Sequence, residues 1–286
     1  MTHHRPRAGF ALVTLLAAVA AGSGAARAGG GDVAAGLLPH RAVYDMHLGD
    51  ADDSASIQGV AGRIVTEFTG SVCDGFTTSF RFVSRISDQD GGTRLTDLRT
   101  TSFETADGGT FQFVTQNYVD QVLTEETKGV ATRGPADTVV DLVKPAAKQV
   151  TLKGEPLFPT QHIIDVIAAA AAGRTILTAP LYDGGETGEK LMLTTAVIGQ
   201  PAAGDDAPAE DDGAMVAKLG GARRWPVRLS YFDANAPQGE QTPLYEISFL
   251  LYESGISRRL VLDYGDFTII GRLSSLELLP TTPCEQ

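Results

Sequence analysis

The chain has 286 residues, and 35 aspartates and glutamates outnumber its 23 lysines and arginines, which gives a formal net charge of −12. A chain this acidic repels nucleic acids and anionic lipid head groups at long range, so we expect neither as a partner. Hydrophobic residues make up 43% of the chain, which is ordinary for a globular protein with a packed core.

Residues 1–28 have the organisation of a cleaved export signal. Two arginines precede an apolar core at 10–21, and Ala26 and Ala28 supply the small residues that a cleavage site requires. The apolar run is shorter than the ~20 residues of a membrane-spanning helix, so an uncleaved anchor is the less favoured alternative. We therefore predict an exported mature chain that begins at Gly29 and is not anchored to a membrane.

Much of the mature chain shows the alternation of apolar and polar residues that is typical of half-buried β-strands. The clearest runs are 80–86, 227–231, 245–251 and 260–264. Asp-Gly pairs between such runs predict turns, because glycine after aspartate adopts the positive φ of tight turns. These turns are Asp90-Gly91-Gly92, Asp107-Gly108-Gly109 and Asp183-Gly184-Gly185. We predict a mainly β, antiparallel sandwich, barrel or wrapped sheet, in a single domain over 29–286.

The segment 160–172 (TQHIIDVIAAAAA) breaks this pattern and predicts a helix, with Thr160 as N-cap and Gly173 after its end. A helix that is apolar almost all round is buried, so we expect the curved sheet to cover it. Where bulky strand side chains leave space beside the small alanines, we expect an apolar groove for an acyl chain or a partner's side chain. The candidate groove residues are Ile163, Ile167, Ala168 and Ala171.

The segment 200–213 (QPAAGDDAPAEDDG) is acidic, of low complexity, and has nothing to bury. We interpret it as a disordered surface loop. A calcium site is the alternative, but the acids lack the ordered spacing of a calcium-binding loop.

The chain has two cysteines, Cys73 and Cys284. An even, minimal set in an exported protein favours a disulfide, which would tie the carboxyl terminus to the start of the fold. The alternative is that both thiols stay reduced and buried.

Motifs for catalysis or metal binding are absent from the sequence: it has no G-x-S-x-G, no H-E-x-x-H and no glycine-rich phosphate loop. His40 and His47 are an odd number of residues apart on an expected strand, so they face opposite sides and do not form a metal pair. We interpret His162 as a local hydrogen-bonding residue. The sequence therefore predicts no catalytic residue, no metal site and no cofactor.

Short motifs spread over nearly the whole mature chain carry a family resemblance. They include His40-Arg41-Ala42-Val43-Tyr44, Cys73-Asp74-Gly75-Phe76, Phe158-Pro159-Thr160-Gln161-His162, Tyr182-Asp183-Gly184, Trp225-Pro226-Val227, Tyr252-Glu253-Ser254-Gly255, Leu262-Asp263-Tyr264-Gly265-Asp266-Phe267 and the final Cys284. In their order and spread the chain resembles the EipB cell-envelope integrity family of alphaproteobacteria. The acidic segment 200–213 looks like an insertion relative to the family.

The resemblance implies a periplasmic protein with an unclosed, spiral-like antiparallel sheet wrapped around one helix, and a disulfide between the two matching cysteines. It also implies a role in envelope integrity and stress resistance without enzyme activity. The implied partners are periplasmic envelope proteins, one of them with tetratricopeptide repeats. The alternative function is a carrier that holds a lipid, an acyl chain or a lipoprotein in an apolar groove of the curved sheet.

Overall fold

The computed structural model describes residues 30–53, 55–202, 213–236, 241–281 and 284. The predicted export signal and most of the acidic segment 200–213 lie outside these residues, so the cleavage site and the loop stay predictions. In the part of the chain that is described, no helix is long and apolar enough to cross a membrane.

Fourteen strands account for most of the described chain. They are β1 (His40–Ala51), β2 (Ile57–Ser71), β3 (Gly75–Asp88), β4 (Thr93–Glu104), β5 (Thr110–Val119), β6 (Val122–Arg133), β7 (Asp137–Lys144), β8 (Lys148–Lys153), β9 (Ile176–Leu181), β10 (Met192–Ile198), β11 (Arg224–Asp233), β12 (Tyr245–Tyr252), β13 (Ser257–Asp263) and β14 (Phe267–Leu278). The predicted runs 80–86, 227–231 and 245–251 fall within β3, β11 and β12, and the run 260–264 extends one residue beyond the end of β13. Gly91, Gly108 and Gly184 have positive φ, so the three predicted turns are confirmed.

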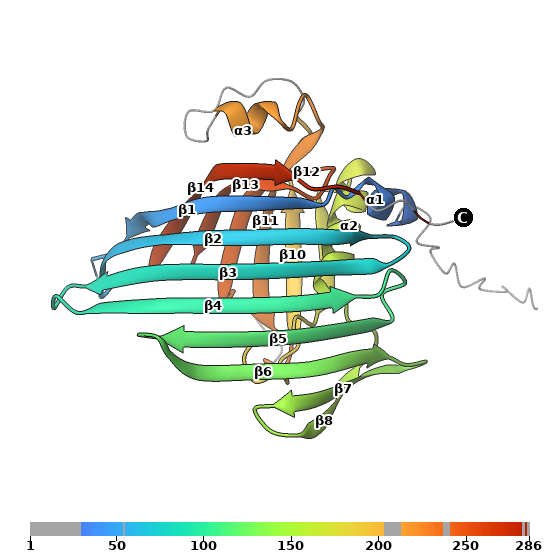
Figure 1. Cartoon of the computed structure of the whole chain (residues 1–286), viewed down its shortest axis with the longest axis horizontal. Helices are drawn as coiled ribbons and strands as arrows, with labels where there is room; N and C mark the ends of the chain where they lie inside the picture. The colour runs from blue at the N-terminus through green and yellow to red at the C-terminus, as the bar shows by residue number, and fades with distance from the viewer. Residues whose placement is uncertain (1–29, 54, 203–212, 237–240, 282–283, 285–286) are drawn as a thin grey trace, which may run out of the picture.

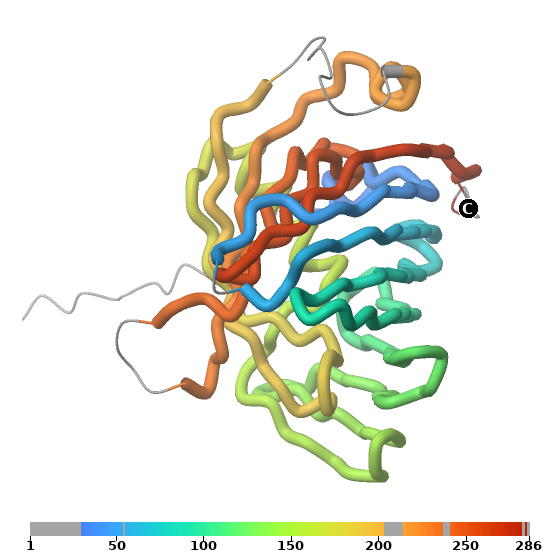
Figure 2. Tube along the Cα trace, turned by 90° about the vertical axis from the view of Figure 1, so that its left-hand side faces the viewer, coloured from blue at the N-terminus to red at the C-terminus, as the bar shows by residue number. Residues whose placement is uncertain are grey.

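The strands form one antiparallel sheet in the order β8-β7-β6-β5-β4-β3-β2-β1-β14-β13-β12-β11-β10-β9. The first and last strands of the chain, β1 and β14, are therefore neighbours in the middle of the sheet, and β8 and β9 are its edges. The sheet curls so that β9–β13 lie across the inner side of the early strands (Figures 1 and 2). Leu157, in the segment after β8, forms an isolated bridge with Leu181 at the end of β9. This bridge does not join the two edge strands into a closed barrel. The predicted fold class, mainly β with an unclosed sheet wrapped around a helix, is confirmed.

Among the described residues, three helices accompany the sheet: α1 (Gly30–Gly36), α2 (Pro159–Ala171) and α3 (Gly213–Ala217). The sequence predicted α2 alone, because α1 and α3 are too short to show helical periodicity. Both α1 and α2 lie at one end of strands β1–β3, on the right in Figure 1. They cover that end of the curled sheet.

The predicted N-cap of α2 is wrong. The helix begins at Pro159, its N-cap is Phe158, and no side chain of that residue caps it. Proline is well suited to the first helical position, because its missing N–H has no partner within the helix there. Glu104 at the end of β4 instead accepts the N–H groups of Thr160 (2.6 Å) and Gln161 (3.3 Å). The carboxylate thus satisfies the helix end from a distant strand.

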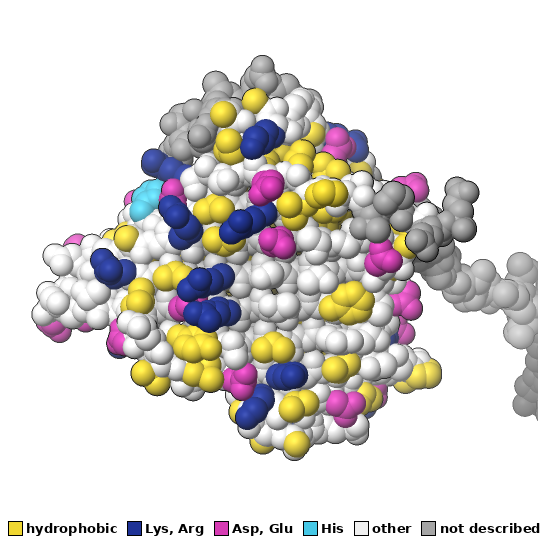
Figure 3. Space-filling model, in the orientation of Figure 1, with side chains coloured by type: hydrophobic (Ala, Val, Ile, Leu, Met, Phe, Trp, Pro, Cys, Tyr) yellow, Lys and Arg dark blue, Asp and Glu magenta, His cyan; other side chains and the backbone are white. Residues whose placement is uncertain are grey.

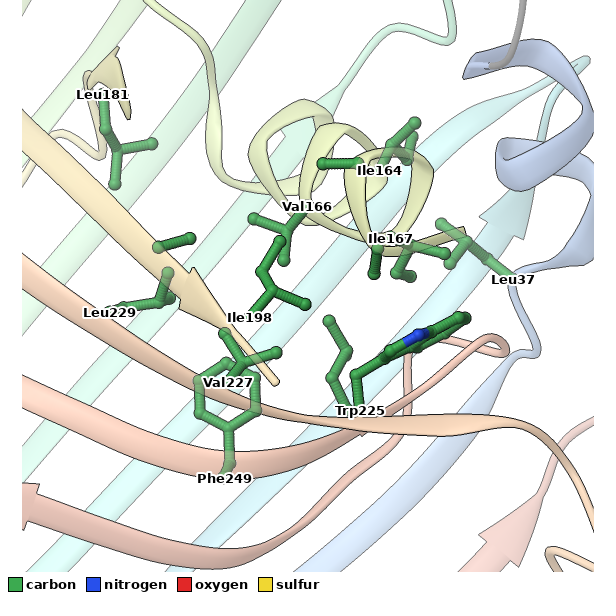
Figure 4. Packing of buried hydrophobic residues seen from close by; sticks show 14 of the residues in the cluster. Leu37, Ile164, Val166, Ile167, Leu181, Ile198, Trp225, Val227, Leu229 and Phe249 are labelled. Atoms are coloured by element: carbon green, nitrogen blue, oxygen red, sulfur yellow. The ribbon is translucent and has the colours of Figure 1, made fainter. Parts of the chain in front are cut away.

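The buried face of α2 packs against the strands that lie across it. Figure 4 shows Val166 and Ile167 of the helix facing Ile198, Trp225 and Val227. All five side chains are buried, as expected for a helix of this composition. The far end of α2 differs from the prediction, because Ala168 is half-buried and Ala171 is exposed.

Cys73 and Cys284 form a disulfide across 211 residues of sequence, with their Cα atoms 5.7 Å apart. Cys73 lies in the turn between β2 and β3, and Cys284 follows β14. The bond therefore ties the carboxyl terminus to an early hairpin, as the sequence predicted, and the alternative of two reduced thiols is wrong.

Candidate functional site

An apolar cavity of about 370 Å³ lies inside the curled sheet. One wall comes from β1–β3 and the other from β11–β13, because side chains at every second position of both strand groups point inward. The apolar lining includes Ile64, Phe68, Phe80, Leu229, Phe249 and Leu260. The volume falls in the range of small-molecule binding sites.

The first turn of α2 and the residue after α1 line one end of the cavity. Pro159, Thr160 and Ile163 from the first turn of α2 line it, together with Leu37, which follows α1. Leu37 is buried, as is the nearby lining residue Leu251. The helix occupies one end of the curl and leaves the space between the two strand groups unfilled.

A row of aromatic rings runs from the cavity lining to the surface. Tyr231 lines the cavity and stacks on Tyr245, with 4.4 Å between ring centroids. Tyr245 is followed by Tyr264 at 6.4 Å, and 42% of Tyr264 is exposed. Exposure therefore increases along the row, away from α2.

The four predicted groove residues are placed differently from one another. Ile163 lines the cavity. Ile167 is buried in the core beneath α2, Ala168 is half-buried, Ala171 is exposed, and none of these three is among the lining residues. The cavity thus lies against the first turn of the helix, and its walls are mostly strand side chains. The alternation of apolar residues in the strands was the signal for those walls, but it does not reveal which strands face each other.

Apart from the tyrosines, His40 is the one titratable side chain among the described residues that line the cavity. Its Nδ1 donates to the carbonyl oxygen of Leu38 at 2.7 Å. Burial lowers the pKa of His40, although the bond to Leu38 acts in the opposite direction, so the ring is neutral at pH 7. Thr66, Thr78 and Ser257 add hydroxyl groups, while no lysine, arginine, aspartate or glutamate lines the cavity among the described residues.

His162 lies outside this lining and ties α2 to the sheet. Its Nε2 is 2.9 Å from the hydroxyl of Thr194 on β10, and that hydroxyl donates to the carbonyl oxygen of Ala179 on β9. The imidazole is therefore the donor to Thr194. Burial lowers the pKa of His162 to about 4. The bond joins separate elements, so the interpretation of His162 as a local hydrogen-bonding residue is wrong.

A metal centre is not apparent in the described ranges, where no group of three or more His, Cys, Asp or Glu residues could hold a metal ion. His40 is buried on the inner face of β1 and His47 is half-buried on the other face, in line with their odd spacing.

The EipB-like family model matches residues 32–280, which is most of the chain. The chain belongs to the EipB-like family. It is 41% identical over 245 residues to the cell envelope integrity protein EipB of Brucella abortus (strain 2308), covering 86% of this chain and 85% of the relative. The resemblance stated from the sequence motifs is therefore confirmed.

A solved structure supports the same fold. This EipB-like chain is similar to the crystal structure of a beta-barrel-like protein of a domain of unknown function from Brucella abortus. The TM-score is 0.78 at 40% sequence identity, and the match covers 85% of this chain and 99% of that chain.

The outer face of β1–β8 in the EipB-like fold carries charges of both signs rather than a patch of one sign (Figure 3). Asp97, for example, lies between Arg81 (2.8 Å) and Arg99 (2.7 Å), and these arginines hold the pKa of Asp97 well below its usual range. Ion pairs at exposed surfaces contribute little to stability or binding. The interior cavity, not this face, is thus the candidate site.

Proposed function

We propose that this EipB-like protein is a non-enzymatic periplasmic protein that supports envelope integrity by holding the aliphatic chain of a lipid or lipoprotein in its interior cavity. The single observation that carries the proposal is a cavity of about 370 Å³ that is lined mostly by apolar side chains between two groups of strands. The export signal of the sequence and the disulfide support the compartment.

Physical chemistry supports an aliphatic ligand. Each methylene that leaves water for an apolar site contributes ~0.8 kcal/mol, so a long chain in this cavity gains several kcal/mol. The aromatic row from Tyr231 to Tyr264 gives such a chain an apolar path between cavity and surface. The sequence offers no triad, metal motif or phosphate loop for an enzymatic alternative.

Filling the cavity tests the proposal. Ile247 is a half-buried lining residue of β12, and Ile247→Trp adds bulk to the space. Val122→Trp is the matched control, because Val122 is 64% exposed at the start of β6. The wild type and the control should bind the apolar fluorescent probe N-phenyl-1-naphthylamine with one-to-one stoichiometry and equal affinity.

The Ile247→Trp variant should lose at least tenfold in probe affinity while it keeps a cooperative melting transition. It should also fail to complement an envelope-stress phenotype that the control complements. Equal probe affinity in both variants, or full complementation by a protein that no longer binds the probe, would refute the proposal.

An apolar row on the outer face of the sheet favours a second candidate function, an adaptor for another envelope protein. Ile176 on β9 is 60% exposed and pairs with Val197 on β10, which is 50% exposed; Leu193, four residues before Val197 on β10, pairs with Pro180 and is 37% exposed. Contiguous exposed apolar side chains often mark protein contacts. The tetratricopeptide-repeat protein expected from the family resemblance is the first partner to test.

Val197→Glu should then abolish co-purification of that protein while leaving probe binding in the cavity unchanged. Co-purification that survives Val197→Glu would exclude this surface as the contact.

A further inference from the structure

His40 lines the cavity near the first turn of α2 and adds an imidazole to a lining whose other polar side chains carry hydroxyl groups. We propose that the cavity selects a neutral aliphatic chain that carries a hydroxyl group, and that His40 accepts the hydrogen bond from that hydroxyl. The inference rests on the proposed function, since it names the ligand class of the same cavity.

The neutral imidazole of His40 carries its proton on Nδ1. Because Nδ1 donates to the carbonyl oxygen of Leu38 at 2.7 Å, a neutral ring carries its lone pair on Nε2, which is then an acceptor. The bond to Leu38 is the one side-chain hydrogen bond that the described residues give His40. The ring of Phe68, 6.0 Å away between centroids, offers Nε2 no donor.

Leaving the Nε2 acceptor of His40 without a hydrogen-bond donor costs free energy. His40 is 6% exposed, and a buried polar group that gives up water without a new partner is destabilising. An alkyl chain pressed against Nε2 would incur this cost, whereas a chain with a hydroxyl at the same depth would avoid it. The site therefore discriminates against a plain hydrocarbon at this end.

A charged ligand group would find no oppositely charged side chain among the described residues that line the cavity. Among the described residues, the lining holds no lysine or arginine to neutralise a carboxylate or phosphate, and no aspartate or glutamate to neutralise an amine. An unpaired charge in an apolar cavity is strongly disfavoured. The group that reaches His40 is thus a neutral donor, and a hydroxyl meets both conditions.

Position sets the orientation of the ligand. His40 pairs with Phe68 of β2, and the buried Leu37 and Leu251 also line the cavity. The aromatic row begins at Tyr231 and ends at the exposed Tyr264. The hydroxyl therefore lies at the inner end, and the hydrocarbon extends from it toward Tyr231.

Two ligands of nearly equal length test the donor requirement. In displacement of N-phenyl-1-naphthylamine, 1-decanol should bind the wild type about 2- to 10-fold more tightly than decyl methyl ether, which has no donor, since one net hydrogen bond is worth that factor. His40→Leu should erase the preference without weakening the ether. His47→Leu, on the other face of β1, should keep it.

A measurement on the wild type covers the case in which His40→Leu does not fold. The ¹⁵N chemical shift of His40 Nε2 should change when 1-decanol binds and stay unchanged with the ether. Equal affinity for the two ligands, or an unchanged Nε2 shift, overturns the inference while the proposed function stands. Failure of both ligands to bind overturns the proposed function as well.

Discussion

The carboxylate of Glu104 accepts the backbone N–H of Thr160 at 2.6 Å, although the two residues are 56 positions apart. Glu104 ends β4 and is 1% exposed, and Thr160 belongs to the first turn of α2. Burial raises the pKa of Glu104, and the hydrogen bonds from Thr160 and Gln161 oppose that shift. The contact fixes the helix against the sheet where its first turn lines the cavity.

Removing this contact should destabilise the protein. We expect Glu104→Ala to lower the free energy of unfolding by about 2–3 kcal/mol, because it leaves buried N–H groups without an acceptor. Glu104→Gln keeps one acceptor oxygen and should cost less. Glu277→Ala, at an exposed position of β14, is the control. Urea denaturation measures all three, and a Glu104→Ala midpoint equal to that of the control would contradict this role.

The buried His162 should make stability depend on pH. Its folded pKa of about 4 lies below the ordinary value of 6.5, so the unfolded chain takes up this proton first as the pH falls. The stabilisation is therefore complete above pH 6.5 and is lost progressively between pH 6.5 and about pH 4, by at most ~1.4 kcal/mol per pH unit.

His162→Gln, which keeps a donor for Thr194, should have a flatter profile over that window. The measurement is the difference between the unfolding free energies of wild type and variant at several pH values from 7.5 to 4.5. Parallel profiles would show that His162 does not titrate in this range.

The disulfide should stabilise mainly by restricting the unfolded chain. Its loop of 211 residues corresponds to a contribution of at most ~5 kcal/mol in the loop-entropy model. Cys284→Ser should therefore lower the melting temperature. Because β14 is hydrogen-bonded to both β1 and β13, its amides should stay protected from hydrogen exchange at 25 °C. Rapid exchange throughout β14 in the folded variant would contradict this expectation.

Two alanines of α2 offer a matched test of its orientation. Ala169 is fully buried and Ala171 is exposed. Ala169→Leu should overpack the core and cost about 1–3 kcal/mol, whereas Ala171→Leu should change stability by about 0.5 kcal/mol or less. Thermal denaturation compares them directly, and the reverse order of stabilities would mean that α2 faces the sheet with its other side.

Local signals in the sequence located strand runs in β3, β11, β12 and β13, three turns and the approximate bounds of α2. Of the bulky residues in the predicted strand runs, Phe80, Tyr231 and Phe249 line the cavity, whereas Phe82 is not among the lining residues. The two cysteines and the expected compartment were sufficient for the disulfide. Each of these inferences depends on neighbouring residues or on composition.

Contacts that depend on how the sheet curls could not be predicted. Glu104 caps α2 only because the curl brings the end of β4 to the helix. The cavity lies beside Ile163 rather than Ala168 because the walls are set by which strands face each other. A single sequence contains no periodic signal for either relationship.

Native mass spectrometry of the protein purified from its native host tests the central claim most directly. We predict a complex heavier than the bare chain by the mass of one aliphatic molecule, which solvent extraction releases in equimolar amount and which Ile247→Trp lacks. The mass of the bare chain alone, from a protein that also fails to take up N-phenyl-1-naphthylamine, would contradict it.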